Sequence, residues 1–142
     1  MTEYIKIKYQ EGAHKLEKIA KGDWIDLYLY EDRTLAAGEF AILPLGISMR
    51  LPKGYEAVFV ARSSTFKKYG LLQTNAMAVI DSSYCGDDDI WGMPVYATRD
   101  VELKKDMRLC QFRIQKNQPK IVFDEVESLG GKARGAFGST GD

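Results

Sequence analysis

Short runs in which apolar and polar side chains alternate recur along the 142-residue chain, separated by turn signals. In the first run, Ile5, Ile7 and Tyr9 alternate with two lysines. A two-residue period predicts a half-buried strand, and many short strands separated by turns roughly every 8–12 residues predict an all-β sandwich or barrel. The predicted strands are residues 5–9, 24–30, 47–51, 56–61, 77–80, 94–98, 108–114 and 121–123.

Residues 61–70 form the one convincing helix candidate, and their length permits one or two turns. Ser63 or Ser64 can cap its N-terminus, two lysines suit its last turn, and Gly70 can close it. Hydroxyls beside Arg62 at a helix N-terminus also form a candidate anion site, because free N–H groups and the helix dipole face the ligand. Plain capping beside a surface arginine fits the same residues equally well.

The size and charge of the chain limit its function classes. With 142 residues it is most simply one domain with a core of its own. Lys and Arg together number 20, as do Asp and Glu. We therefore expect no global field that attracts nucleic acid or an acidic membrane, and an anionic ligand would have to be met by local positive groups.

Cysteine use and hydropathy predict a cytoplasmic protein. Cys85 and Cys110 form no C-x-x-C pair and no metal-ligand spacing with His14, so we expect two reduced thiols. The N-terminus lacks the apolar segment of a signal peptide, and no window is apolar enough to span a bilayer. We expect no association with a membrane.

Residues 73–86 place a single carboxylate at the end of an apolar run. Asp81 directly follows residues 77–80, Tyr84 comes three residues later, and Gly86 then allows a tight turn. A carboxylate held at the rim of a rigid sheet can serve as a general base. An aspartate that opens a turn is more commonly solvated or bonded to its own backbone, so this stretch alone leaves both interpretations open.

Two further acidic features have a functional and a plain interpretation. Asp26 lies within a predicted strand, where aspartate is unfavourable unless it binds something or lies at an edge; a solvent-facing strand residue remains equally open. The run 87–89 consists of three aspartates. Consecutive side chains do not converge on one ion, so a solvated turn is favoured over a metal cluster.

The last residues, 128–142, differ in composition from the rest of the chain. They contain five glycines together with Arg134, Phe137, Ser139 and Thr140. Such a segment is typical of a frayed terminus. Glycine-rich backbone with an arginine and hydroxyls also suits the wrapping of phosphates, and a phenylalanine can stack on a base. The two interpretations differ in whether a ligand orders the segment.

Taken together, five segments resemble the ordered motifs of the trimeric dUTP pyrophosphatase (dUTPase) family. They are residues 24–27, 61–65, 75–86, 104–111 and 134–141. Five motifs in the family's order are far more specific than any one of them, and the resemblance covers essentially the whole chain.

The resemblance implies an all-β, jelly-roll-like fold with a β-domain over residues 1–127 and a flexible C-terminal arm over residues 128–142. It implies a homotrimer in which the arm of one subunit closes over a site built by the others. The implied reaction converts dUTP and water to dUMP and pyrophosphate, with Mg²⁺ bound mainly through the triphosphate. This reaction limits uracil in DNA and supplies dUMP for dTMP synthesis.

The resemblance also assigns roles to single residues. Asp81 would deprotonate the water that attacks the α-phosphorus, Tyr84 would pack under the deoxyribose, and Asn75 would read the uracil edge together with the hairpin backbone. Asp26 would support the water shell of the metal or the architecture of the site. The phosphates and the base would be contacted by Arg62, Ser63, Ser64 and Gln111 from the β-domain and by Arg134, Phe137, Gly138, Ser139 and Thr140 from the arm.

The sequence departs from the family pattern at several positions. Residues 23–25 replace the usual Ala-Gly-aromatic before Asp26, and Ala78 replaces a common glycine in the hairpin that approaches the base. Other common residues are replaced by Ala61, Lys105 and Ala136. None of these changes removes a chemical group that the reaction needs.

Two alternatives remain. A dCTP deaminase-like enzyme shares the fold but needs a glutamate near the base, whereas residues 73–89 contain no acidic residue except aspartate. A dUTPase-fold regulatory protein would bind a partner protein and use the nucleotide as a switch. Retention of Asp81, Arg134 and Phe137 argues against a protein without activity, and a second regulatory role stays open.

Overall fold

The computed structural model describes residues 2–18 and 21–138, which fold into eleven strands and one short helix. The prediction of an all-β protein with a single small helix is confirmed. The elements are β1 (Lys6–Tyr9), β2 (Ile25–Tyr28), β3 (Arg33–Leu35), β4 (Phe40–Pro44), β5 (Ile47–Arg50), β6 (Tyr55–Ala61), α1 (Thr65–Tyr69), β7 (Leu71–Gln73), β8 (Met77–Ile80), β9 (Gly92–Ala97), β10 (Val101–Leu103) and β11 (Arg108–Lys116). The helix of the described residues is too short to cross a membrane.

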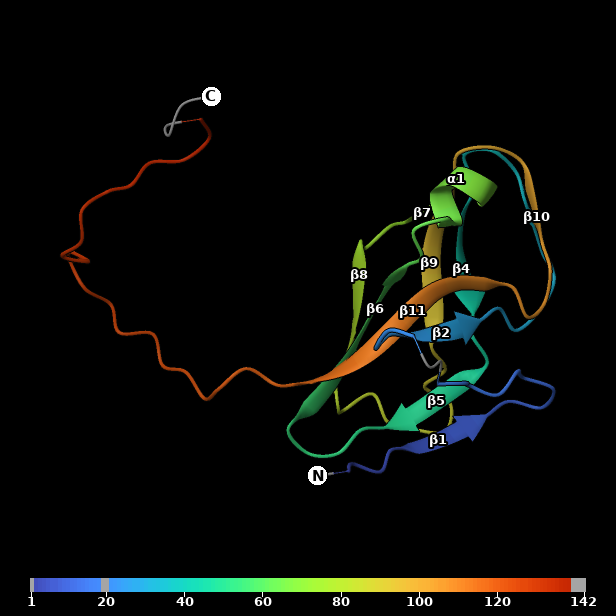
Figure 1. Cartoon of the computed structure of the whole chain (residues 1–142), viewed down its shortest axis with the longest axis horizontal. Helices are drawn as coiled ribbons and strands as arrows, with labels where there is room; N and C mark the ends of the chain where they lie inside the picture. Colours follow the sequence, from blue (N-terminus) through green and yellow to red (C-terminus); the bar gives the residue numbers. More distant parts are fainter. Residues whose placement is uncertain (1, 19–20, 139–142) are drawn as a thin grey trace.

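The strands pair in the antiparallel, long-range manner of a jelly roll. A four-stranded sheet has the order β2-β11-β6-β8, and a three-stranded sheet has the order β4-β9-β7. Two smaller ladders join β1 to β5 and β10 to β3. In Figure 1, β11 crosses in front of β9, so that the two larger sheets form the faces of one sandwich.

An aromatic cluster fills the space between the two larger sheets. The ring of Trp91 lies 6.1 Å from that of Phe59 on β6 and meets the ring of Phe112 on β11 edge-on at 5.4 Å, measured between centroids. All three side chains are fully or almost fully buried. Burying a large apolar side chain contributes about 1.5–3 kcal/mol, so this cluster holds β6 and β11 against the second sheet.

The helix follows its sequence signals closely. Ser64 occupies the N-cap position, and Gly70 ends the helix in a left-handed conformation (φ 66°) with its N–H donating to the Phe66 carbonyl at 2.7 Å. The buried Thr65 hydroxyl donates to the Leu109 carbonyl at 2.6 Å and so ties the helix to β11. This contact fixes the position of the residues that immediately precede the helix.

The predicted strand at residues 121–123 is wrong. After β11 the described chain, residues 117–138, contains no helix or strand and runs away from the β-domain (Figure 1). Val122 and Phe123 are 88 % and 92 % exposed. The apolar pattern of a strand is present, but a strand also needs a hydrogen-bonded neighbour, which the body of this protomer does not supply here.

Candidate functional site

Strand β8, the turn that precedes it and the loop that follows it border a cavity of about 420 Å³. Asn75, Asp81 and Tyr84, all from the central stretch of the sequence, lie on its wall. The rest of the lining is mainly apolar and comprises Ile42, Phe59, Ala78, Val79, Ile80, Trp91, Gly92 and Pro94, with Ser83. A largely apolar cavity with a few convergent polar groups is the usual form of a small-molecule site.

Asp81 presents its carboxylate directly after the last residue of β8. The main-chain N–H of Ser83 donates to Asp81 Oδ1 at 2.8 Å, which leaves Oδ2 outside that bond. The bond from the main chain of Ser83, and a further one from its side chain, lower the pKa of Asp81 below the ordinary 3.8 of this carboxyl. The group is exposed and ionised at neutral pH, so it can accept a proton.

Tyr84 is fixed at both its backbone and its ring. Its N–H donates to the Asp81 carbonyl at 3.0 Å, and its hydroxyl donates to the Ile90 carbonyl at 3.0 Å across the loop. The ring is 40 % exposed on the cavity wall. A flat, held ring beside the carboxylate is able to pack against one face of a ligand.

Asn75 stands at the turn between β7 and β8. The adjacent Ala76 has φ +58°, and the Asn75 side-chain Oδ1 accepts a hydrogen bond from Gln73 Nε2 at 3.0 Å. Ala78, which replaces a common glycine, lies in regular β8 opposite Phe59 and is buried. Its side chain therefore lines the cavity without straining the strand.

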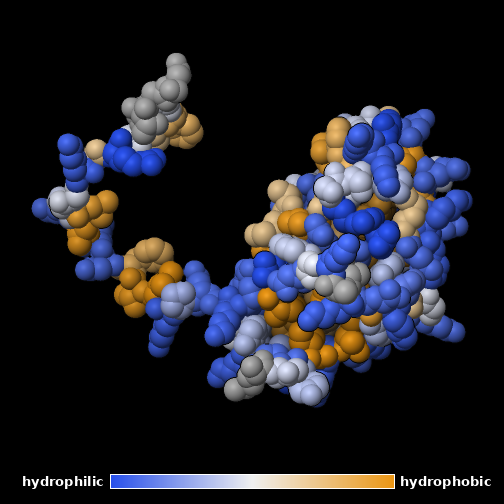
Figure 2. Space-filling model, in the orientation of Figure 1, coloured by the Kyte–Doolittle hydropathy of each residue, from blue (hydrophilic) through white to orange (hydrophobic). Residues whose placement is uncertain are grey.

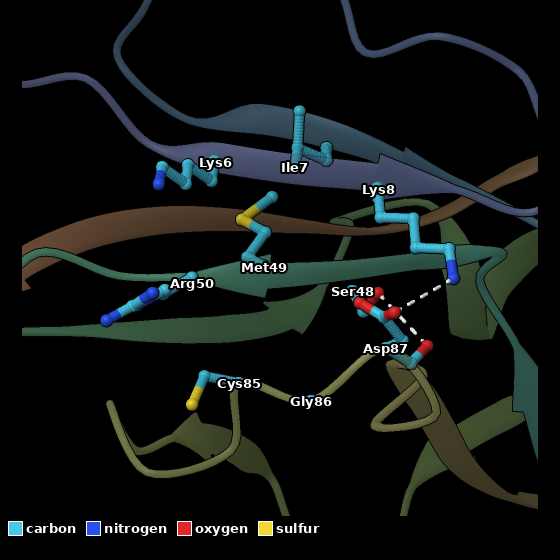
Figure 3. A pocket seen from close by; sticks show the side chains of 9 residues that line it. All are labelled: Lys6, Ile7, Lys8, Ser48, Met49, Arg50, Cys85, Gly86 and Asp87. Carbon is cyan, nitrogen blue, oxygen red and sulfur yellow. Dashed lines mark hydrogen bonds and ion pairs between the residues drawn. The ribbon is translucent and has the colours of Figure 1, made fainter.

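The far side of the same loop is fastened to the β1–β5 ladder (Figure 3). Lys8 on β1 pairs with the Asp87 carboxylate at 3.5 Å, and the Ser48 hydroxyl donates to the Asp87 carbonyl at 3.5 Å. The Gly86 N–H donates to Asp89 Oδ2 at 2.9 Å. In the part of the chain that the structure describes, no three or more His, Cys, Asp or Glu side chains gather in a way that could hold a metal.

A second polar cluster surrounds Asp26 on β2. The residue is 8 % exposed, and its carboxylate pairs with Arg62 Nε at 3.3 Å and Arg108 Nη1 at 3.4 Å. Gln111 lies directly opposite Asp26 on β11. The solvent-facing interpretation of Asp26 is therefore wrong: its two oxygens are engaged by arginines, and they orient the guanidinium of Arg62.

The sequence analysis assigned no role to Arg108, although the residue lies in the motif at residues 104–111. The available signal was Asp26 itself, because a buried carboxylate within a strand requires cations nearby. The structure supplies one from β11 and one from the residue after β6.

Ser63 and Ser64 lie next to Arg62 at the start of α1. Ser64 makes no side-chain capping hydrogen bond, although it occupies the N-cap position. Ser63 is exposed, and Arg62 is partly exposed. The prediction of a capping serine is thus correct for the backbone position but not for the hydroxyl, which remains available to a ligand.

The two clusters lie at opposite ends of one strand pair. Ile80, next to Asp81, pairs with Ala57 near the beginning of β6, whereas Arg62 follows the end of β6. Arg62 lies six positions further along the chain than Glu56, the residue opposite Asp81, a distance of roughly 20 Å. Within one protomer, therefore, the main chain of the carboxylate cluster and that of the arginine cluster lie well apart.

The predicted residues of the arm lie apart from both clusters. Arg134, Phe137 and Gly138 are exposed, and the segment to which they belong extends away from the β-domain (Figures 1 and 2). Ser139 and Thr140 lie outside the described residues. The structure thus gathers Asn75, Asp81 and Tyr84 on one cavity and separates the other predicted site residues that it describes into two groups.

Comparison with known proteins shows a consistent relationship. The profile described as dUTPase matches residues 23–141. The SPbeta prophage-derived deoxyuridine 5'-triphosphate nucleotidohydrolase YosS of Bacillus subtilis is 52% identical over 138 residues, covering 96% of this chain and 97% of that protein. The deoxyuridine 5'-triphosphate nucleotidohydrolase of Clostridium tetani is 34% identical over 146 residues, covering 99% of each.

Among solved structures, the dUTPase of Staphylococcus bacteriophage 80alpha with dUpNHpp has a TM-score of 0.83 at 18% identity, covering 99% of this chain and 100% of that one. At this identity the likeness concerns the fold, and it agrees with the jelly-roll-like arrangement described above. The sequence matches extend over nearly all of the chain and include the cavity, the arginine cluster and most of the arm. On this ground the chain belongs to the dUTPase family.

Proposed function

We propose that the protein is a dUTP diphosphatase, which hydrolyses dUTP to dUMP and pyrophosphate and so limits uracil in DNA while supplying dUMP for dTMP synthesis. The observation that carries the proposal is the cavity on which Asn75, Asp81 and Tyr84 meet, with Asp81 held ionised at its rim. We place the activity in the cytoplasm, consistent with the two unpaired thiols of Cys85 and Cys110.

The proposed chemistry begins with a proton transfer to Asp81. Its carboxylate takes a proton from the water that attacks the α-phosphorus, and pyrophosphate leaves. General-base assistance of this kind contributes about 10²–10⁴ in rate. Tyr84 packs beneath the deoxyribose, where its fixed ring leaves no room for a 2′-hydroxyl, and Asn75 contacts the uracil.

The phosphates are held by the arginine cluster in this proposal. Arg62, Ser63 and Ser64 supply donors to the triphosphate together with Gln111, and Asp26 orients Arg62 through its salt bridge. Arg134, Phe137, Gly138, Ser139 and Thr140 add the contacts of the arm to the γ-phosphate and the base. These guanidinium groups place positive charge at the site itself. A chain with zero net charge needs such local groups to bind an anionic ligand.

Mg²⁺ fits this site as an ion carried by the substrate. The described residues offer no cluster of carboxylates to it, and Asp26 is engaged by two arginines, so any role of Asp26 toward the metal is indirect, through water. Bound to the triphosphate, Mg²⁺ would neutralise charge and orient the phosphates. The dUTPase from phage phi11 of S. aureus is described with a structural Mg(II) ion.

A homotrimer completes the site in this proposal. The roughly 20 Å between Asp81 and Arg62 along β6 exceeds the reach of groups that must contact one triphosphate, so the two clusters must come from different subunits. The exposed face of the three-stranded sheet supports this assembly. Phe40, Tyr96 and Leu72 stand side by side across β4, β9 and β7, and they are 57 %, 43 % and 46 % exposed.

Replacing the central residue of this apolar row is expected to dissociate the trimer. Tyr96→Glu places a charge where three subunits would bury apolar surface, so light scattering should change from about three times 16.0 kDa to a single 16.0 kDa chain. Tyr4→Glu, at an 88 % exposed tyrosine outside this sheet, is the control and should stay trimeric. A Tyr96→Glu variant that keeps the wild-type mass would contradict the assignment of this face.

The pH dependence of hydrolysis should report the lowered pKa of Asp81. Because the ionised carboxylate is the active form, kcat/KM falls only as pH drops through this pKa, and the acid limb from this group should lie below pH 3.8. Ser83→Ala keeps the main-chain N–H but removes the hydroxyl, so the limb should move slightly upward. Ionisation of the substrate affects the wild type and Ser83→Ala equally, so the difference in pH between their acid limbs reports the pKa of Asp81. A limb that does not move, or moves down, would contradict this cause.

The proposed function is tested by measuring pyrophosphate release from dUTP, dTTP, dCTP and UTP with Mg²⁺. Selective turnover of dUTP is the expected result. Release of ammonia from dCTP would instead support the deaminase-like alternative. Binding of nucleotide without turnover would support the regulatory alternative, in which the fold acts through a partner protein.

A further inference from the structure

The side chain of Gln73, the last residue of β7, makes an unusual set of contacts beside the cavity. Its Nε2 donates to two acceptors, the Phe59 carbonyl at 3.2 Å and Asn75 Oδ1 at 3.0 Å. Its Oε1 is buried and has no hydrogen-bond partner among the described residues. A buried carbonyl oxygen without a partner is costly, and an apolar side chain at this position would avoid that cost. A glutamine at this position therefore carries a cost in stability, and a functional role of its Nε2 contacts would explain its presence.

The contact with Phe59 determines which way the Gln73 amide points. Phe59 lies in the middle of β6, paired with Phe112 on one side and Ala78 on the other, so its carbonyl cannot rotate. A main-chain carbonyl only accepts hydrogen bonds. The Gln73 amide group that faces it must be the NH₂ group, since the reverse orientation would place two acceptors against each other.

The orientation of Gln73 determines that of Asn75 in turn. The same NH₂ group faces Asn75, and a donor there requires the acceptor Oδ1 of the Asn75 amide. The backbone of Asn75 is also held, because its carbonyl accepts from the Met77 N–H at 2.5 Å. The Asn75 NH₂ group is therefore the part of this amide that is left for a ligand in the cavity that Asn75 lines.

We propose that Gln73 is a positioning residue that selects uracil over cytosine by fixing the Asn75 amide with its donor toward the base. This inference rests on the proposed function. A donor fixed in this way pairs with the O4 carbonyl of uracil. Cytosine carries an amino group at the same ring position, so two donors would meet and one would stay unpaired. Sites built on such hydrogen bonds discriminate strongly because the wrong ligand leaves a buried polar group unsatisfied.

Two substitutions of Gln73 separate its chemistry from its volume. Gln73→Met keeps a similar length but frees the Asn75 amide, so kcat/KM for dUTP should fall about fivefold to tenfold with little change for dCTP. Gln73→Glu keeps the shape but offers only acceptors. It should turn the Asn75 amide over, lower kcat/KM for dUTP about tenfold to a hundredfold, and shift the dUTP-to-dCTP ratio further toward dCTP.

A double-substitution cycle shows whether Gln73 acts through Asn75. In the Asn75→Ala background, Gln73→Met and Gln73→Glu should leave the dUTP-to-dCTP ratio unchanged. Gln10→Glu, a glutamine substitution away from the cavity, should leave the ratio at the wild-type value. Melting temperatures identify any variant that fails to fold. If the charge introduced by Gln73→Glu prevents folding, Gln73→Met, which is uncharged and similar in size to glutamine, still tests the proposal.

Binding of dUMP and dCMP, measured by calorimetry on the same variants, gives the ratio without any turnover. A wild-type protein that hydrolyses no nucleotide would refute the proposed function, yet its dUMP-to-dCMP affinity ratio would still show whether Gln73 selects the base. Equal losses for both bases in Gln73→Met and Gln73→Glu would overturn the inference. So would a change of ratio that persists in the Asn75→Ala background.

Discussion

Asp81→Asn is expected to lower kcat for dUTP hydrolysis by about 10²–10⁴ while leaving the affinity for the nucleotide nearly unchanged. Asparagine keeps the shape of the side chain and can still accept the hydrogen bond from the Ser83 N–H, which here reaches Oδ1 at 2.8 Å. It cannot take a proton from water at neutral pH. Steady-state kinetics and binding of a non-hydrolysable analogue measure the two quantities separately.

Asp88→Asn is the matched control for this substitution. Asp88 is an exposed aspartate of the same loop, so its replacement removes the same charge a few residues away. We expect near wild-type kcat for Asp88→Asn. A kcat that survives Asp81→Asn, or that falls equally in both variants, would show that Asp81 is not the base.

Removing the arm, by ending the chain after residue 127, is expected to lower the rate of dUTP hydrolysis by about 10³–10⁵, and Arg134→Gln should account for most of this loss. In related phosphoryl-transfer chemistry, an arginine that stabilises the charge of the transition state contributes a factor of this size. The melting temperature should stay close to that of the full chain, because residues 128–138 are exposed and lie away from the β-domain in Figure 1. Lys132→Gln, which removes a neighbouring charge of the arm, should have little effect.

Mixing two inactive variants tests whether the arm acts between subunits. Asp81→Asn subunits retain a wild-type arm, and Arg134→Gln subunits retain a wild-type carboxylate. If the arm of one subunit completes the site of another, mixed trimers contain sites with both groups intact and recover part of the activity. Absence of recovery in mixtures shown to contain mixed trimers would place the arm and the carboxylate in the same subunit.

Much of the fold follows from the sequence because one face of each strand is buried. In β1, for example, Ile7 and Tyr9 are partly buried, whereas Lys6 and Lys8 are exposed, and this alternation is visible in the residues themselves. The helix was predictable for a similar reason, since Gly70 and the final lysines are local signals. The absence of a strand at residues 121–123 was not predictable. The residues have the apolar pattern of a strand, and that pattern does not show whether a neighbouring strand is present to pair with it.

The candidate site was predictable only where its residues are close in sequence. Asn75 lies in the turn before β8, and Asp81 and Tyr84 lie in the loop after it, so a single motif brings them to one cavity. The engagement of Asp26 by two arginines depends on the pairing of β2 with β11 and of β11 with β6. Neither the spacing of these residues nor their types indicates that pairing.

The contacts of Gln73 are likewise invisible in the sequence. They depend on a carbonyl of β6 that strand pairing brings beside the turn between β7 and β8. The apolar row of Phe40, Tyr96 and Leu72 also arises from pairing between strands that are far apart in the chain. Predicting either feature requires the register of the sheets, which local patterns leave undetermined.

The most direct measurement of the central claim is hydrolysis of dUTP in water enriched in ¹⁸O, with mass analysis of both products. Attack of water on the α-phosphorus, assisted by Asp81, predicts dUMP that carries one ¹⁸O atom and pyrophosphate that carries none. Label in pyrophosphate, or formation of dUDP and phosphate, would place the attack on another phosphorus and contradict the account. Failure to form dUMP at all would contradict both the mechanism and the proposed activity.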